Sequence, residues 1–276
     1  MIASFKYLDI STPIHRLDPR TKIVLLLCAA FTAASVPDLR VLLVLLALAV
    51  LYYSLARLPW RETRAAWSFI LFFIVVLAGV NTLLAGTGSG EQGSVVLVQL
   101  PLSIRITWQS LIEAIGIICR MLIGAFMAIP ITFTIPPTRF GVAFRGLGLS
   151  DRIAFAVDLA IRLVPTYAED FRNSIDAQRA RGYEIDKLQG GFVARVRKLA
   201  PLFVPVTMTA ILSGEDITNA LDMRGFGLRP RTWLHARRLR VVDWVLIVFG
   251  LALFVGTIVW RGFGGGQLWI PPFPFK

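Results

Sequence analysis

The sequence has few of the residues on which catalytic and metal centres usually depend. Histidine occurs only at His15 and His235, which excludes an HExxH motif and a three-histidine zinc site. The two cysteines, Cys28 and Cys119, lie in apolar runs, where we expect small core side chains and no disulfide framework. No Gly-Lys dipeptide occurs, so the chain has no Walker A loop with which to hydrolyse ATP. We therefore expect no catalytic residue, no metal ligand and no cofactor bound by this chain.

Charged residues are also scarce. They make up 17% of the 276 residues, against about 25% in a typical soluble domain, whereas apolar residues make up 56% and the mean hydropathy is +0.68. The apolar residues are concentrated in long runs, which indicates a membrane protein. In a soluble protein the formal net charge of +12 would suggest nucleic-acid binding, but in a membrane protein it is typical of loops beside an anionic leaflet. We expect contact with the lipid bilayer and none with nucleic acid.

Five apolar runs are candidate membrane spans: residues 23–36, 41–56, 67–85, about 111–135 and 241–260. A span needs ~20 residues, range ~17–25, so the first two runs must include flanking residues. Asp18 followed by Pro19 predicts the start of the first helix, because an N-cap residue precedes a proline at the first helical position. The sequence therefore predicts an all-α membrane protein with about five transmembrane helices and a helical cytoplasmic region between the fourth and the fifth.

Lysine and arginine set the orientation of these spans. Basic residues precede the first run and separate the second from the third, and 17 of the 29 lie between Arg139 and Arg240. Only Arg40 separates the first run from the second, and only Arg105 the third from the fourth. This alternation predicts a multi-pass protein with a cytoplasmic N-terminus and an external C-terminus. It divides the chain into an N-terminal membrane region (1–136), a cytoplasmic region (137–240) and a C-terminal helix with an outer tail (241–276).

Two ionisable residues within the fourth run leave a functional question open. Glu113 and Arg120 are seven residues apart and so share one face of a helix. Ionisable groups at membrane depth are candidates for a transport pathway by default. The simpler interpretation, which we favour, places Glu113 at the outer interface and has Arg120 brace neighbouring helices.

The cytoplasmic region contains amphipathic helices. Apolar residues at every fourth position predict one helix from Asp151 to Gly182, and a second is expected from about Pro201 to Gly225. The apolar first half of the second helix leaves a sixth span open, although its two prolines better fit a helix that grazes the membrane. The apolar faces exceed what a five-span bundle can cover, which indicates an interaction surface. We expect these residues to form a docking platform for a separate membrane subunit: Phe155, Leu159, Leu163, Phe203 and Val204.

The two cytoplasmic helices end in the same way. Residues 174–183 align with residues 217–226 so that an alanine, Arg181 with Arg224, a glycine and an aromatic residue coincide. In each case a glycine ends the helix and the arginine occupies the carbonyl end, where the helix dipole favours a cation. A guanidinium group presented there can pair with a partner's carboxylate through two parallel hydrogen bonds. A single helix can end in Arg-Gly without any function, but the repetition favours a functional role.

With these motifs the chain resembles the transmembrane T component of energy-coupling factor (ECF) transporters, the prokaryotic ABC-type importers of vitamins and of cobalt or nickel ions. The similarity extends over nearly the whole chain and is carried by Thr12–Lys22, Arg120, Pro136-Pro137, Leu147–Leu149, Ile161–Pro165, Ala180–Gly182, Pro201–Pro205 and Met223–Gly227. Two positions depart from the family. Gly214 lies in a run that is usually more basic and helix-favouring, and Met223 stands where alanine is usual.

The resemblance implies a non-enzymatic coupling subunit in a prokaryotic cell membrane. Its two motifs, Ala180-Arg181-Gly182 and Met223-Arg224-Gly225, would enter grooves on two ABC ATPase subunits from coupling helices arranged as an X. ATP and Mg would be bound by those subunits, and a separate substrate-binding S component would select the vitamin or ion. The second hypothesis is a self-sufficient transporter with an intramembrane site that includes Glu113 and Arg120. It predicts inverted repeats among the spans, and the sequence has no such repeat.

Overall fold

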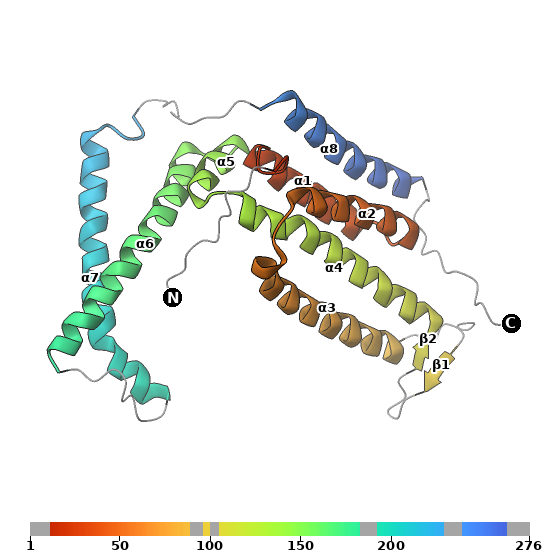
Figure 1. Cartoon of the computed structure of the whole chain (residues 1–276), viewed down its shortest axis with the longest axis horizontal. Helices are drawn as coiled ribbons and strands as arrows, with labels where there is room; N and C mark the ends of the chain where they lie inside the picture. The colour runs from red at the N-terminus through yellow and green to blue at the C-terminus, as the bar shows by residue number, and fades with distance from the viewer. Residues whose placement is uncertain (1–11, 89–95, 100–104, 183–191, 229–238, 264–276) are drawn as a thin grey trace. The chain divides into compact units, whose positions relative to one another are not determined.

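The computed structural model describes residues 12–88, 96–99, 105–182, 192–228 and 239–263 (Figure 1). The chain divides into two compact units, Lys6–Pro136 with Arg237–Lys276 and Pro137–Ala236 with Met1–Phe5. We call the first the membrane unit and the second the α6/α7 unit, and each is described by itself.

The membrane unit is a helix bundle. Its helices are α1 (Pro19–Ser35), α2 (Leu39–Ala56), α3 (Trp60–Gly88), α4 (Trp108–Thr134) and α8 (Val241–Gly262), and a short antiparallel hairpin of β1 (Val96–Gln99) and β2 (Arg105–Thr107) precedes α4. Among the described residues, α2, α3, α4 and α8 contain stretches long and apolar enough to cross a membrane. The predicted all-α membrane class is confirmed. Helix α1 has 17 residues, at the lower limit for a span, so the count of five stays a prediction.

The starts of α1 and α2 follow from local sequence. The Asp18 side chain accepts a hydrogen bond from the Arg20 backbone N–H at 3.0 Å, and Pro19 occupies the first helical position. Asp38 caps α2 in the same way, accepting from the Arg40 backbone N–H at 3.0 Å. Each carboxylate satisfies a backbone donor that the helix itself leaves unpaired. The predicted start of the first helix at Asp18-Pro19 is confirmed.

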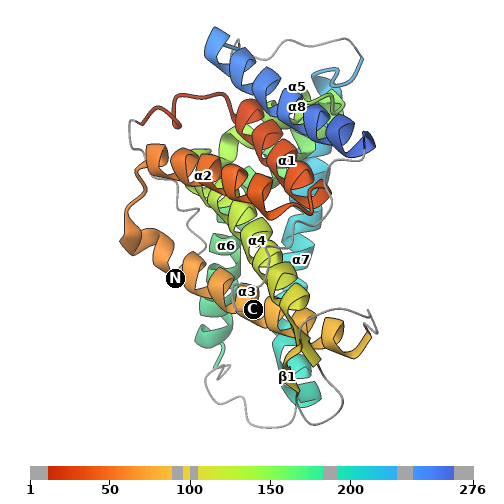
Figure 2. The same cartoon turned by 90° about the vertical axis from the view of Figure 1, so that its right-hand side faces the viewer.

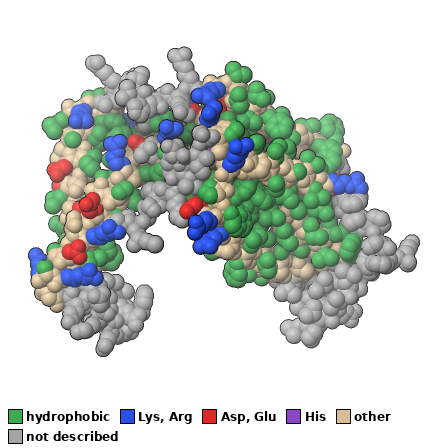
Figure 3. Space-filling view, in the orientation of Figure 1, with side chains coloured by type: hydrophobic (Ala, Val, Ile, Leu, Met, Phe, Trp, Pro, Cys, Tyr) green, Lys and Arg blue, Asp and Glu red, His purple; other side chains and the backbone are tan. Residues whose placement is uncertain are grey.

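Helix α4 is the centre of the bundle and packs against α1, α2 and α3, while α8 packs against α1 (Figure 2). One buried cluster includes Leu42, Cys119 and Ile123, and a second is built on Trp67. Both cysteines are buried and free, as expected of small core residues. Large apolar side chains also cover the visible outer face of the bundle (Figure 3), as a surface in contact with lipid requires.

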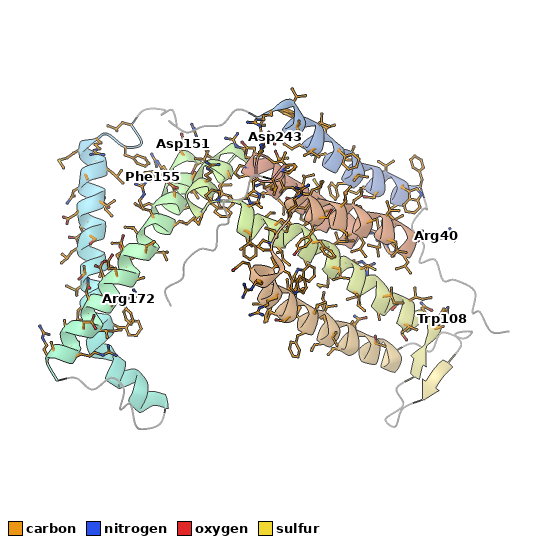
Figure 4. The ribbon with its side chains drawn as sticks, viewed as in Figure 1. Arg40, Trp108, Asp151, Phe155, Arg172 and Asp243 are labelled. Carbon is orange, nitrogen blue, oxygen red and sulfur yellow. The ribbon has the colours of Figure 1, made fainter. Side chains whose placement is uncertain are left out.

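A buried polar network joins α1, α4 and α8 at one end of the bundle. The Asp243 carboxylate, on the first turn of α8, accepts hydrogen bonds from the Asp18 N–H at 3.1 Å, the Thr21 hydroxyl at 3.2 Å and the Arg240 N–H at 2.9 Å. The Lys22 ammonium group donates to the Thr134 hydroxyl at 3.0 Å and to its carbonyl at 3.3 Å. Lys22 and Asp243 are only 1% and 2% exposed. Figure 4 shows Asp243 at the end of α8 that meets the start of α1.

The α6/α7 unit contains the two longest helices of the described chain. It comprises the 3-10 turn η1 (Pro137–Arg139), α5 (Phe140–Gly146), α6 (Asp151–Ala180) and α7 (Phe192–Met223). Helix α6 matches the predicted helix and contains Pro165. Helix α7 begins at Phe192, earlier than the predicted Pro201, and runs through that proline. A proline inside a helix removes its own backbone hydrogen bond and crowds the carbonyl four residues earlier, which kinks a helix without necessarily ending it. Among the described residues α7 is not a candidate membrane span, so the sixth-span alternative gains no support.

Candidate functional site: two Arg-Gly helix ends

The first Arg-Gly motif forms the C-terminal end of α6. Ala180 is the last helical residue, and Arg181 is the C-cap, whose N–H donates to the Gln178 carbonyl at 3.1 Å. Gly182 follows with a φ of +82° and donates its N–H to the Arg179 carbonyl at 2.9 Å. This left-handed conformation strains residues with a Cβ atom, which is why glycine ends the helix here. The Arg181 side chain is exposed, and Tyr183, the aromatic residue of the first repeat, lies outside the described residues.

The second motif forms the end of α7 with the same backbone geometry. Gly225 has a φ of +62°, and its N–H donates to the Asp222 carbonyl at 2.9 Å. The Phe226 N–H donates to the Leu221 carbonyl, also at 2.9 Å, which completes a Schellman motif. Arg224 is exposed and occupies the position that Arg181 occupies on α6. The sequence repeat is therefore also a structural repeat.

A third helix end shows what distinguishes these two. Helix α5 also ends in a Schellman motif, with Gly148 at a φ of +100° and a Leu149 N–H that donates to the Phe144 carbonyl at 3.2 Å. Its C-cap residue is Leu147, which carries no charge. The turn is thus a general way to end a helix in this chain. Helix α2 also has an arginine C-cap, Arg57, but that residue is itself left-handed with a φ of +46° and no glycine follows it. Among the described helix ends, α6 and α7 share an arginine C-cap followed by a left-handed glycine.

Helices α6 and α7 contact each other so that their two Arg-Gly ends lie far apart. The Phe155 ring, near the start of α6, packs against the Phe226 ring just after α7, with centroids 4.6 Å apart. Towards the other end of α6, Phe171 packs against Phe203 at 6.0 Å. An α-helix rises about 1.5 Å per residue, so Arg181 lies on the order of 40 Å from the Arg224 end. Figure 4 shows Phe155 and Arg172 at well-separated places along α6.

The end of α7 is held against α6, which the sequence pattern does not reveal. Besides the Phe155–Phe226 contact, the guanidinium group of Arg152 lies over Gly227, where an added Cβ atom would approach its Nε to 3.5 Å. At Gly182 an added Cβ atom would meet nothing within 4 Å. The α7 end is thus supported by tertiary contacts from α6, whereas the residues that follow Gly182 at the α6 end lie outside the described residues.

The predicted docking platform differs in exposure along its length. Phe203 and Val204 on α7 are 56% and 61% exposed, whereas Phe155, Leu159 and Leu163 on α6 are partly buried. Phe155 is engaged with Phe226, so it supports the α7 end in addition to any contact with a partner. The exposed apolar surface also continues along α7 beyond the predicted residues, through Met208, Ile211 and Leu212.

Glu113 and Arg120 lie together in the membrane unit. Both line a cavity of about 320 Å³, to which Asn81 of α3 also contributes. The Arg120 guanidinium group donates to the carbonyls of Ala33 at 3.1 Å and Val36 at 3.0 Å, at the C-terminal end of α1. These carbonyls have no partner within their own helix and carry the negative end of its dipole. Arg120 therefore braces α1 against α4, which is the role the sequence favoured.

Among the described residues, no group of three histidine, cysteine, aspartate or glutamate side chains is placed to hold a metal ion; His235 lies outside them.

Comparison with known proteins gives the same family over most of the chain. An ABC transporter ATP-binding protein of Bifidobacterium longum is 31% identical over 232 residues, which are 80% of this chain but only 28% of that protein. The energy-coupling factor transporter transmembrane proteins EcfT of Heliobacterium modesticaldum and Listeria innocua are 27% and 29% identical over 270 residues. These alignments cover 93% and 92% of this chain and 96% of each relative.

A family model described as cobalt transport protein (CbiQ) matches residues 10–235. Helices long and apolar enough to span a membrane agree with a multi-pass membrane protein. The chain therefore belongs to the CbiQ cobalt transport protein family and is a transmembrane component of the energy-coupling factor type.

Proposed function

We propose that this chain is the coupling subunit of an ECF-type importer for vitamins or transition-metal ions, and that it transmits the ATP-driven motion of two ABC ATPase subunits to a substrate-binding membrane subunit. The observation that carries the proposal is the pair of Arg-Gly ends, which share one turn geometry and lie on the order of 40 Å apart. At that separation each end contacts its own ATPase subunit. ATP and Mg are bound by those subunits, and this chain contributes no catalytic residue.

The chemistry of the two ends supports ATPase attachment. Arg181 and Arg224 are exposed, and each lies at the C-terminal end of a long helix. A carboxylate in a groove of each ATPase subunit pairs with the guanidinium fork through two hydrogen bonds. The Bifidobacterium longum relative supports this partner class, because there a stretch similar to this chain is part of an ATP-binding protein.

The substrate-binding subunit docks on the apolar platform of α6 and α7. Phe203 and Val204 are exposed, although large apolar side chains are usually covered in a complete assembly. Substrate choice belongs to that subunit, and this chain supplies a surface and no substrate site. In this arrangement the α6/α7 unit faces the cytoplasm, and the N-terminus lies on the same side of the prokaryotic cell membrane, as the distribution of lysine and arginine predicts.

The test is alanine substitution of the two arginines in the full chain, with assembly and transport measured. Removal of one arginine leaves the ATPase carboxylate buried without its cation, at a cost of about 3–5 kcal/mol, whereas a surface salt bridge contributes about 0–1 kcal/mol. We expect Arg181→Ala or Arg224→Ala to impair ATPase attachment and transport while the chain stays folded in the membrane. Lysine should rescue only partly, since it keeps the charge and loses the fork.

Two arginines of α6 are matched controls. Arg172 is exposed, and Arg179 forms an exposed ion pair with Asp176 at 3.7 Å. Neither occupies a C-cap position, so both should tolerate alanine. Full assembly and full transport in the Arg181→Ala/Arg224→Ala double variant would show that the repeat is only a pair of helix ends.

The self-sufficient transporter remains a second candidate, because Glu113, Arg120 and Asn81 line one cavity. It predicts substrate uptake by this chain alone in proteoliposomes. Two of the Arg120 N–H groups are already engaged with α1 carbonyls, and Glu113 accepts a hydrogen bond from Gln109 at 3.4 Å. Both polar groups thus have structural partners, which favours the coupling subunit.

A further inference from the structure

The two Arg-Gly ends carry different neighbours, although their backbone turns match. Ala180 precedes Arg181, whereas Met223 precedes Arg224. Met223 is 84% exposed, and Leu228, in the turn that follows, is 83% exposed. An added Cβ atom on Gly225 would lie 3.4 Å from the Leu228 Cδ1, so the Leu228 side chain lies over the glycine. Two large apolar side chains therefore accompany Arg224. At the α6 end the small Ala180 stands in the place of Met223, and Ile185, which aligns with Leu228, lies outside the described residues.

The turn that carries these side chains is held in place. The Phe226 ring packs against Phe155 on α6, and the Leu228 N–H donates to the Gly225 carbonyl at 3.3 Å. Arg152 lies over Gly227. A turn fixed in this way loses little conformational freedom when a partner binds, which favours tight association.

We infer that Met223 and Leu228 form, with Arg224, a mixed apolar and cationic contact for an ABC ATPase groove that has an apolar pocket beside its carboxylate. Interface residues that dominate affinity are large side chains buried in such pockets around a charged or aromatic anchor. The exposed apolar area next to a cation calls for a partner with both features. A lipid surface would bind only the apolar side chains, and an acidic peptide would bind only the arginine. The ATPase groove of the proposed function binds both.

The inference rests on the proposed function, and it adds that the two ends are not equivalent. The α7 end binds a groove that has an apolar pocket, whereas the α6 end binds a groove in which an alanine fits at the place of Met223. The α7 end accordingly makes the larger contribution to ATPase attachment.

The experiment measures ATPase affinity through the α7 end alone. The probe is the ABC ATPase pair that accompanies the tagged wild-type chain, purified separately and titrated against the full chain in nanodiscs. Arg181→Ala is present throughout, so that only the α7 end binds. In this background we expect Met223→Gln and Leu228→Gln each to weaken binding by about tenfold to a hundredfold, which corresponds to the burial of one large apolar side chain. Both side chains are mostly exposed, so folding should be unchanged, and circular dichroism checks this.

Two further variants separate the possible failures. Arg224→Ala in the same background tests the proposed function: wild-type affinity there overturns both ideas. If Arg224→Ala loses ATPase binding while Met223→Gln and Leu228→Gln keep wild-type affinity, only the inference is overturned. The inference is also overturned if Met223→Gln and Leu228→Gln lose contact with the substrate-binding subunit or with lipid and keep their ATPase affinity. The exchange Ala180→Met/Met223→Ala, in a chain with both arginines, should weaken attachment. Wild-type affinity of that exchange variant would show that the two ends are equivalent.

Discussion

The buried carboxylate of Asp243 makes a quantitative prediction about the stability of the membrane unit. Asp243→Ala removes the acceptor for three hydrogen bonds, from the Asp18 N–H, the Thr21 hydroxyl and the Arg240 N–H, at 2.9–3.2 Å. Hydrogen bonds to a charged group contribute about 1.5–3 kcal/mol each. The three share one carboxylate and are not independent, so we expect a loss of about 3–5 kcal/mol in the free energy of unfolding.

Asparagine at position 243 distinguishes the contributions of the two carboxylate oxygens. Asp243→Asn keeps an acceptor for the Asp18 N–H and the Thr21 hydroxyl, but its amide group faces the Arg240 N–H, where donor meets donor. We expect about half the loss of the alanine variant. Asp38→Ala is the matched control, since Asp38 also caps a membrane helix, where its carboxylate accepts a hydrogen bond from the Arg40 N–H. It should cost about 1 kcal/mol.

The assay is equilibrium unfolding in mixed micelles titrated with a denaturing detergent and followed by circular dichroism. A free energy of unfolding for Asp243→Ala within about 0.5 kcal/mol of the wild-type value would refute the reasoning, because three buried donors would then have lost their acceptor at no cost.

Three further predictions follow from the same structure. Arg120→Ala should lower the free energy of unfolding by about 2–4 kcal/mol, measured as above, because two carbonyls at the end of α1 lose their donors; an unchanged stability would reopen a transport role. Gly225→Ala should destabilise the chain by about 1–2 kcal/mol, because Gly225 has a φ of +62°. Gly214→Ala should stabilise it by about 1 kcal/mol, because Gly214 lies inside α7 and an added Cβ atom there would meet nothing within 4 Å. Equal effects of the two substitutions on the free energy of unfolding would contradict both assignments. A cysteine at Gly88 should react with an impermeant maleimide added outside intact cells, and labelling only from the cytoplasmic side would overturn the topology.

Local sequence was sufficient to predict the features that depend on a few neighbouring residues. Asp18 and Pro19 predict the start of α1, and Gly182 and Gly225 predict the ends of α6 and α7, because capping and the left-handed turn are properties of adjacent residues. The apolar runs and the low charge predict the all-α membrane class by the same local logic. The predicted start of α7 at about Pro201 is wrong, because the helix begins at Phe192 and runs through its prolines.

The tertiary structure alone decided which distant residues meet. Asp243 reaches the start of α1 across 225 positions of sequence, Arg120 reaches the end of α1 across 87, and Phe155 packs against Phe226. Periodicity indicates which face of a helix is apolar, but it carries no information about which other helix covers that face. The sequence therefore determined that two helices end in Arg-Gly. The packing of α6 against α7 decided that these ends lie far apart and that the α7 end is held against α6, because separation and support arise from contacts between helices.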